Sequence, residues 1–330
     1  MTFLIERPVD LLEMAGSHSY PRRVSSPIDP HDPRIVPVPG PSGIPASDGV
    51  DPEPDRALRA KEEALLARLT EAGRLMVAFS GGVDSSYLAW AAHQALAEDA
   101  LAVTAVSPSY PASHRAMAEE VVELCGLAHR FIETHEMERP DYRANASDRC
   151  YHCKSELFEQ MDRLAGELGF ARVCYGVNTD DTSDFRPGHR AAAEHDVLAP
   201  FLDVDLSKQE IRTLSRAAGL PTADLPASAC LSSRLPYGTE VTIERLDQVE
   251  RAEAALQELG FAQVRLRHHG ELARVEIDPS ELDRALDPAM AARIVAKIKP
   301  LGFRYVSLDL EGYRTGSLNE VLQISRDPIR

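Results

Sequence analysis

SGGVDSS, residues 80–86, is the most informative segment of this chain. It follows an apolar run at 74–79 that reads as a buried strand, and a helical pattern begins within it at Asp84. The two glycines let backbone N–H groups approach phosphate oxygens closely, and the amino terminus of a helix adds partial positive charge. The segment therefore predicts a phosphate-binding turn between a strand and a helix. A glycine-rich turn without a ligand is the alternative.

The side chains of this turn are typical of a site for ATP and Mg2+. The predicted nucleotide contacts are Ser80, Gly81, Gly82, Asp84, Ser85 and Ser86. The hydroxyls can donate hydrogen bonds to phosphate, while Asp84 either caps the helix or helps to hold Mg2+. The turn contains no lysine, so it is not a Walker loop, in which a lysine reaches the terminal phosphates.

Apolar strands alternate with helices from residue 55 to about residue 235. The expected strands are 74–79, 101–107, 130–134, 173–178 and 197–202, and the expected helices are 57–69, 84–96, 113–125, 155–168 and 207–218. The last of these helices has clear ends, because Ser207 and Glu210 can form a capping box and Gly219 can stop it. The alternation predicts an α/β fold with a doubly wound parallel sheet, in which ligands bind beyond the carboxyl ends of the strands.

The pattern changes on both sides of this region. Beyond Pro236, a helix at 244–259, strands at 263–268 and 272–277, a helix at 289–299 and a strand at 305–310 predict a second, smaller α+β domain. Residues 1–54 carry 11 of the 23 prolines and show no hydrophobic periodicity. We therefore expect a disordered leader at 1–54, an ATP-binding domain at 55–235 and a small domain at 236–330.

The composition excludes several classes of protein. A net charge of −16 opposes stable binding to nucleic acid, which calls for a basic face. No apolar run approaches the ~20 residues that span a bilayer, and no secretory signal is visible, so we expect a cytoplasmic protein without a membrane segment. Five cysteines in such a chain do not indicate a disulfide framework.

The turn at 80–86 resembles the SGGxDS signature of the PP-loop ATP pyrophosphatases, which have an adenine nucleotide alpha hydrolase-like fold. These enzymes split ATP into AMP and pyrophosphate, and the substrate is usually activated as an adenylate. The resemblance implies a second set of contacts in GVNTDD, residues 176–181, where Asn178, Asp180 and Asp181 would coordinate Mg2+ or position the acceptor. An Asx-rich turn without such a role is the alternative.

Three of the cysteines lie outside the regular apolar patterns. Cys150 and Cys153 form the segment CYHC, which we expect just before a helix, and Cys230 lies in ASACLSSR. By contrast, Cys125 and Cys174 fall within a helix and a strand, and we interpret them as small buried hydrophobic residues.

The neighbours of the three cysteines are basic. Arg149, Lys154 and Arg234 stand beside them and would favour the thiolate forms. Three thiolates can hold a [4Fe–4S] cluster and leave its fourth iron open, where an extra sulfide can bind. A zinc site with His152 as a further ligand, or a redox pair, remains an alternative.

Several blocks together point to one family. SGGVDSSYLA, DRCYHCKSELF, YGVNTDD, PASACLSSRLPYG, VRLRHHG and EGYRTGSLNE occur in this order from residue 80 to residue 320. They resemble the LarE family, ATP-dependent sulfur transferases that help to make the nickel-pincer nucleotide cofactor of lactate racemase. The resemblance implies that ATP adenylates a carboxylate of pyridinium-3,5-dicarboxylate mononucleotide. A sulfur nucleophile then displaces AMP and leaves a thiocarboxylate.

The family divides by its cysteines, and its members tend to form homo-oligomers through the second domain. Some members sacrifice a cysteine at the position of Cys230 and lack the CxxC pair. Others carry all three cysteines and resemble cluster-bearing enzymes. Because Cys150, Cys153 and Cys230 are all present, the resemblance places this chain in the second group, with catalytic and cluster-ligating roles for the three thiols.

Such a nucleotide substrate carries a phosphate, which calls for cations. Arg265 and Arg267 alternate with Val264 and Leu266, so both guanidinium groups lie on one face of a strand. The planar fork of arginine suits phosphate, and Arg234 is a third candidate. A solvated strand face is the alternative.

Other functions fit the sequence less well. An ammonia-dependent amide ligase would bring a glutaminase, and residues 1–54 are too short and too proline-rich for one. A tRNA thiolase would display a basic groove or an added RNA-binding domain. A non-catalytic nucleotide-binding or zinc-stabilised protein would not need both an ATP turn and unpaired thiols.

Overall fold

We describe the fold from a computed structural model that covers residues 54–183, 187–226, 229–314 and 316–318. The predicted leader lies outside these residues, except for Pro54. In chain order the elements are α1 (Arg56–Ala72), β1 (Leu75–Ala78), α2 (Val83–Leu96), β2 (Ala100–Val106), α3 (Ala112–Cys125), β3 (His129–Glu133), α4 (Pro140–Arg143), α5 (Arg149–Leu168), β4 (Arg172–Tyr175), α6 (Gly188–Glu194), α7 (Pro200–Asp203), α8 (Lys208–Ala217), α9 (Ile243–Glu258), β5 (Val264–His269), β6 (Leu272–Ile277), α10 (Leu282–Leu286), α11 (Pro288–Ile298) and β7 (Tyr305–Leu308). Within the described ranges, no helix is both long and apolar enough to cross a bilayer.

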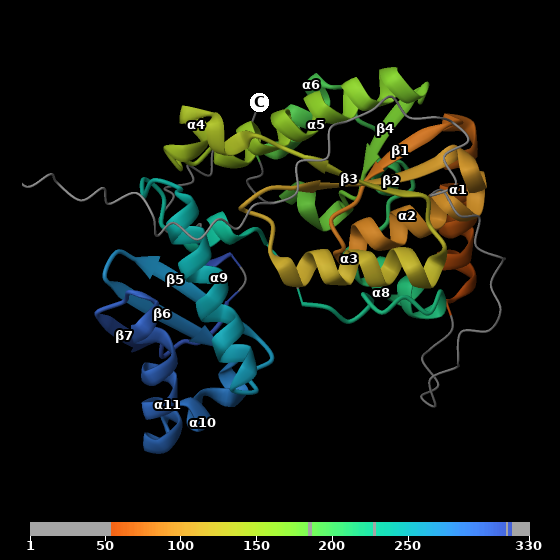
Figure 1. The fold of residues 1–330 in the computed structure, drawn as a ribbon. Helices are drawn as coiled ribbons and strands as arrows, with labels where there is room; N and C mark the ends of the chain where they lie inside the picture. The colour runs from red at the N-terminus through yellow and green to blue at the C-terminus, as the bar shows by residue number, and fades with distance from the viewer. Residues whose placement is uncertain (1–53, 184–186, 227–228, 315, 319–330) are drawn as a thin grey trace, which may run out of the picture. The chain divides into compact units, whose positions relative to one another are not determined.

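The first sheet has four parallel strands in the order β3-β2-β1-β4. Both of its faces are covered. Met76 of β1 packs with α5 and α6, whereas its neighbours Leu75 and Val77 pack on the other side with α1, α2 and α3 (Figure 1). Alternate residues of one strand thus enter different cores, which confirms the α/β fold with a doubly wound sheet.

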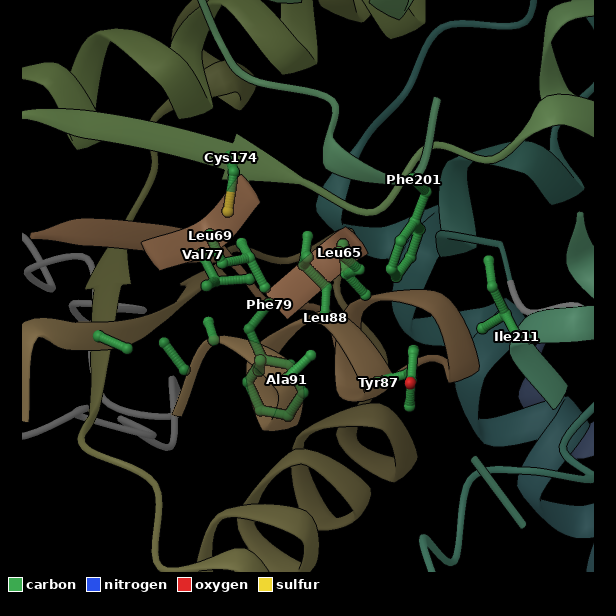
Figure 2. Close-up of a cluster of buried hydrophobic side chains, with 14 of the residues drawn as sticks. Leu65, Leu69, Val77, Phe79, Tyr87, Leu88, Ala91, Cys174, Phe201 and Ile211 are labelled. Atoms are coloured by element: carbon green, nitrogen blue, oxygen red, sulfur yellow. The ribbon is translucent and has the colours of Figure 1, made fainter. Parts of the chain in front are cut away.

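The larger core of this sheet gathers side chains from distant parts of the chain. Figure 2 shows Leu65 and Leu69 of α1, Leu88 of α2 and Phe201 of α7 around the strands. Cys174 of β4 is fully buried among them, as predicted from its apolar strand pattern. Because several elements share this core, it holds the ends of the strands, and the segments that follow them, in fixed positions.

One predicted strand, at 197–202, is wrong. Only Leu198 pairs with the sheet, through a single bridge to Cys174, and α7 begins at Pro200. Proline has no backbone N–H for a strand ladder, and its fixed φ suits the first turn of a helix. By contrast, the capping box at the start of α8 is confirmed, with Ser207 and Glu210 bonded to each other's backbone.

A second difference concerns the start of α5. The helix begins at Arg149, six residues before the predicted start at Ser155, and therefore includes both cysteines of the CxxC pair. The i, i+3 spacing of Cys150 and Cys153 consequently places them on one face of a helix. The expectation that they precede a helix is wrong.

The second sheet is small and mixed. Its order is β5-β6-β7, with β5 antiparallel and β7 parallel to β6. Its core combines one face of these strands with α9 and α11, and includes Leu246, Val249, Leu266, Val275 and Ile294. Helix α10 was not predicted. A second, smaller α+β unit is confirmed, while the boundary at residue 235 stays a prediction.

Candidate functional site

The segments that follow β1, β2 and β4 meet at the carboxyl ends of the parallel strands. Gly176, after β4, packs against the turn after β1 so closely that a Cβ on it would lie 3.0 Å from the carbonyl carbon of Asp84. Tyr110, after β2, donates a hydrogen bond from Oη to the carbonyl oxygen of Ser80 at 3.0 Å. The phosphate turn is therefore held from both sides, at the edge where ligands bind in such sheets.

The turn itself is shaped by internal hydrogen bonds. Gly81 has a φ of 78°, and a Cβ on it would lie 3.0 Å from the carbonyl oxygen of His114, so glycine is required there. Ser85 Oγ accepts from the backbone N–H of Ser80 and donates to the carbonyl of Gly82, both at 3.1 Å. Ser86 is fully buried, and its Oγ has no hydrogen-bond partner in the part of the chain that the structure describes.

Lys208, which sequence reasoning missed, supplies a cation to the turn. Its Nζ forms a short ion pair with Asp84 Oδ2, and its backbone N–H donates to Asp180 Oδ2 at 2.7 Å. Burial raises the pKa of Asp84, and the charge of Lys208 offsets part of this effect. The lysine that the turn lacks thus comes from the first residue of α8, 124 residues further along the chain.

The predicted second contact set lies beside the same carboxylate. Asn178 donates from Nδ2 to Asp84 Oδ1 at 3.2 Å. Its Oδ1 also accepts from the N–H of Asp180 at 3.0 Å, and its own N–H donates to Asp181 Oδ2 at 3.3 Å. The three residues therefore form an Asx-type turn, and Asn178 joins it to the phosphate turn through Asp84, so the structural and the ligand-binding interpretation are compatible.

The three cysteines singled out by sequence come together. The thiol of Cys153 interacts electrostatically with those of Cys230 and Cys150. Arg149 lies between the segments, with Nη2 at 4.0 Å from Cys150 Sγ and an electrostatic interaction with Cys230. Cys150 is exposed, while Cys153 and Cys230 are partly buried. Cys153 and Cys230, 77 positions apart in the chain, are therefore near enough to interact.

The expectation that basic neighbours favour thiolates is wrong for Cys153. Burial raises the pKa of its thiol well above the usual range, and the buried carboxylate of Glu136 and the thiol of Cys230 add to the effect. Lys154 lowers the pKa, but by less. Among the residues described, no three His, Cys, Asp or Glu side chains are arranged to hold a metal ion.

Two of the three predicted phosphate contacts are engaged with carboxylates. Arg234 is 2% exposed and bidentate to Glu253, with two N–O distances of 2.9 Å. Arg267 is bidentate to buried Glu276, at 2.9 and 2.8 Å, and its Nη1 donates to the carbonyl of Ser233. Both guanidinium forks therefore face protein carboxylates, which the sequence-based assignment to phosphate did not foresee.

Arg234 also fixes the thiol segment. Its Nη1 donates to the carbonyl oxygens of Ala229 at 2.6 Å and Cys230 at 3.0 Å. Glu253 holds the guanidinium group in place, and Arg234 thereby fixes the peptide groups on either side of Cys230. Arg234 acts on the sulfur site through the position of this backbone.

Arg265 is the remaining candidate, and it belongs to a cluster of cations. Burial lowers its pKa, and repulsion from Arg234 lowers it further. The pKa of His114 is lowered to about 4, mainly by burial and further by the charges of the same two arginines. His114 is therefore neutral at pH 7, and it stands on α3 next to the phosphate turn. An anion entering here would relieve the repulsion between the arginines.

We expect Arg234→Ala to destabilise the protein by about 3–5 kcal/mol, because it leaves Glu253 buried without its counter-ion. The change in the free energy of unfolding is measured by urea denaturation of the two proteins. Arg251→Ala is the matched control on the same helix as Glu253, since Arg251 forms an exposed pair with Asp247, with side chains 59% and 55% exposed. Its loss should cost less than about 1 kcal/mol. Equal costs for both substitutions would contradict a structural role for Arg234.

Comparison with known proteins gives the family of the chain. Residues 58–157 match the asparagine synthase family. The chain is 44% identical over 265 residues to an uncharacterized protein of Synechocystis sp., an alignment covering 80% of this chain and 99% of that protein. It is 33% identical over 266 residues to the pyridinium-3,5-bisthiocarboxylic acid mononucleotide synthase of Lactiplantibacillus plantarum, covering 80% of this chain and 96% of the synthase.

Proposed function

Because the chain belongs to the LarE family, we propose that it is an ATP-dependent sulfur transferase of nickel-pincer cofactor biosynthesis. Its acceptor is pyridinium-3,5-dicarboxylate mononucleotide. A carboxylate oxygen of the acceptor attacks the α-phosphate of ATP, and pyrophosphate leaves. A sulfur nucleophile then attacks the acyl carbon, the bond to AMP breaks, and a thiocarboxylate remains.

One observation carries this proposal: a single segment after β2 contacts both the ATP turn and the sulfur site. Tyr110 Oη donates to the carbonyl of Ser80, and the carbonyl of Ser109 accepts from the N–H of Leu231 at 2.9 Å. Leu231 directly follows Cys230. An adenylate formed at the turn would therefore be generated near the thiols, as transfer between the two groups requires.

The turn and its neighbours would carry out the adenylation. Lys208 and Mg2+ would balance the negative charge that develops on the leaving pyrophosphate. Asp84, Asp180 and Asp181 are the carboxylates that we propose as ligands of Mg2+ there. Arg265 is our remaining candidate for the phosphate of the acceptor, while Arg234 and Arg267 would act through the loops that they bind.

We propose that the three thiols are ligands of a [4Fe–4S] cluster and not of a single metal ion. Ligands of a cluster bind separate irons and stand further apart than the ligands of one ion, and three thiols leave one iron open. Cys150, Cys153 and Cys230 would hold the cluster. When bound, it would supply the sulfur for transfer. Burial near Glu136 disfavours a free thiolate at Cys153, a cost that metal binding would offset.

The test is to measure iron, acid-labile sulfide and the ultraviolet–visible spectrum on protein purified without oxygen. We expect about four irons per chain, absent from a Cys150/Cys153/Cys230→Ala triple variant. Pyrophosphate release with ATP and acceptor is measured in parallel, and it should occur in both proteins. If reconstitution loads no iron and mass spectrometry shows that Cys230 has lost its sulfur after turnover, the cluster proposal is wrong and Cys230 is a sacrificial donor.

A further inference from the structure

The thiol-bearing segment after residue 229 has no strand ladder to hold it. Residues Leu231–Arg234 form a single 3-10 turn, and the chain continues without regular structure to the start of α9. Its position against the CxxC pair therefore depends on individual hydrogen bonds and side-chain packing. Many of these come from one short region, residues 142–149, which also leads into α5 and the CxxC pair.

Asn145 is the first of these contacts. It is fully buried between α4 and α5, and its φ of 53° is a conformation that asparagine tolerates better than most residues. Its Nδ2 donates to the carbonyl oxygens of Pro236 at 2.9 Å and Thr239 at 2.8 Å. Its Oδ1 accepts from Arg149 Nη1 at 2.5 Å. One amide side chain thus fixes both a loop and a guanidinium group.

Arg149 is the second contact. It is 3% exposed, and Nη1 also donates to the carbonyl oxygen of Ser232 at 2.9 Å. Its other terminal nitrogen, Nη2, points to Cys150 Sγ. The same guanidinium group therefore touches its neighbour in the CxxC pair and the backbone two residues beyond Cys230.

Tyr142 is the third contact. Its ring is 1% exposed and packs in the same apolar cluster as Leu231 and Cys153. Its Oη lies 2.7 Å from Ser232 Oγ, and it interacts electrostatically with both Cys230 and Cys153. The hydroxyl is therefore placed between the two segments that carry the thiols.

We propose that Tyr142, Asn145 and Arg149 are positioning residues that set the distance between Cys230 and the Cys150–Cys153 pair. This inference rests on the proposed function only for its catalytic consequence. Sulfur transfer requires the sulfur to stand at attack distance from the acyl carbon, and a shift of 1 Å can cost about 100-fold in rate. Adenylate formation takes place at the phosphate turn and does not require that spacing.

Tyr142→Phe tests the proposal, because it removes one hydroxyl and keeps the ring. The matched control is Tyr87→Phe, since Tyr87 is likewise fully buried and donates to Glu62 Oε1 at 2.8 Å, in the core between α1 and α2. Both variants lose one hydrogen bond of a buried tyrosine and should show similar melting temperatures. Only the first one touches the sulfur site.

The first readout is the spacing itself, measured on cluster-free reduced protein with dibromobimane, which bridges two neighbouring thiols. Peptide mapping should show Cys230 bridged to Cys150 or Cys153 in the wild type and in Tyr87→Phe. We expect several-fold less bridging in Tyr142→Phe and in Arg149→Lys. The second readout is kinetic: Tyr142→Phe should transfer sulfur about 10- to 100-fold more slowly while still releasing pyrophosphate.

Two results would overturn the inference. One is equal bridging and equal sulfur transfer in the Tyr142→Phe and Tyr87→Phe proteins. The other is the absence of any bridge to Cys230 in the wild type, since the thiols would then not be neighbours. A failure of the proposed function looks different. In that case the wild type releases no pyrophosphate with the acceptor, yet the bridging yields still report the spacing.

Discussion

Lys208→Ala is expected to lower the rate of ATP-dependent pyrophosphate release by about 10²- to 10³-fold. Lys208 Nζ pairs with Asp84 at the phosphate turn, and it is the cation that this turn lacks in its own sequence. When ATP binds, the lysine would stabilise the charge that builds up on the leaving group. Pyrophosphate release, measured with a coupled phosphate assay under saturating ATP and acceptor, gives the rate.

Lys61→Ala is the matched control for this substitution. Lys61 Nζ forms an ion pair with Glu210 at 2.8 Å, and its side chain is 30% exposed, as is that of Lys208. Both lysines thus pair with a carboxylate near the start of α8, but only Lys208 reaches the turn. We expect Lys61→Ala to release pyrophosphate at the wild-type rate. If both variants lose activity to the same extent, the defect lies in the anchoring of α8, and Lys208 has no direct role.

Cys230→Ser is expected to abolish formation of the thiocarboxylate while pyrophosphate release continues. Serine keeps the size of the side chain but removes the sulfur, which is either a cluster ligand or the donor itself. The adenylate would still form, because the phosphate turn is intact, and water would then hydrolyse it to the free acid. Mass spectrometry of the acceptor, with pyrophosphate measured in the same sample, separates the two steps.

Cys125→Ser serves as the control for this prediction. Cys125 lies at the end of α3, where burial raises the pKa of its thiol to about 11, and it packs against the main core. Its replacement should leave thiocarboxylate formation near the wild-type rate. Full thiocarboxylate formation by Cys230→Ser would show that the sulfur passes by a route that does not involve this residue.

The sequence predicted those parts of the molecule in which local signals agree with the fold. The strand, turn and helix around residues 75–96 were recognised because apolar pattern, glycines and helix start all point to the same structure. The ends of α8 were found for the same reason. The strand predicted at 197–202 is wrong because the segment is apolar enough for a strand, yet Pro200 favours the first turn of a helix.

The site was harder to predict because its partners are distant in sequence. Arg234 and Arg267 look like phosphate ligands until Glu253 and Glu276 are seen beside them, 19 and 9 residues away. Lys208 did carry a signal: it directly follows the helix cap Ser207, where a positive charge opposes the helix dipole. Such a local conflict marks functional positions, and here the carboxylate of Asp84 resolves it.

Glu253 has a consequence for how this chain can vary. Its carboxylate pairs with Arg234 and also accepts the backbone N–H of Leu266 on strand β5 at 2.9 Å. One side chain therefore accepts a hydrogen bond from the edge strand of the small sheet and also anchors the arginine that binds the backbone next to Cys230. Replacing either Arg234 or Glu253 alone would leave a buried charge without its counter-ion. Substitutions at the segment that carries Cys230 are thus constrained by Glu253, a residue of the smaller α+β unit.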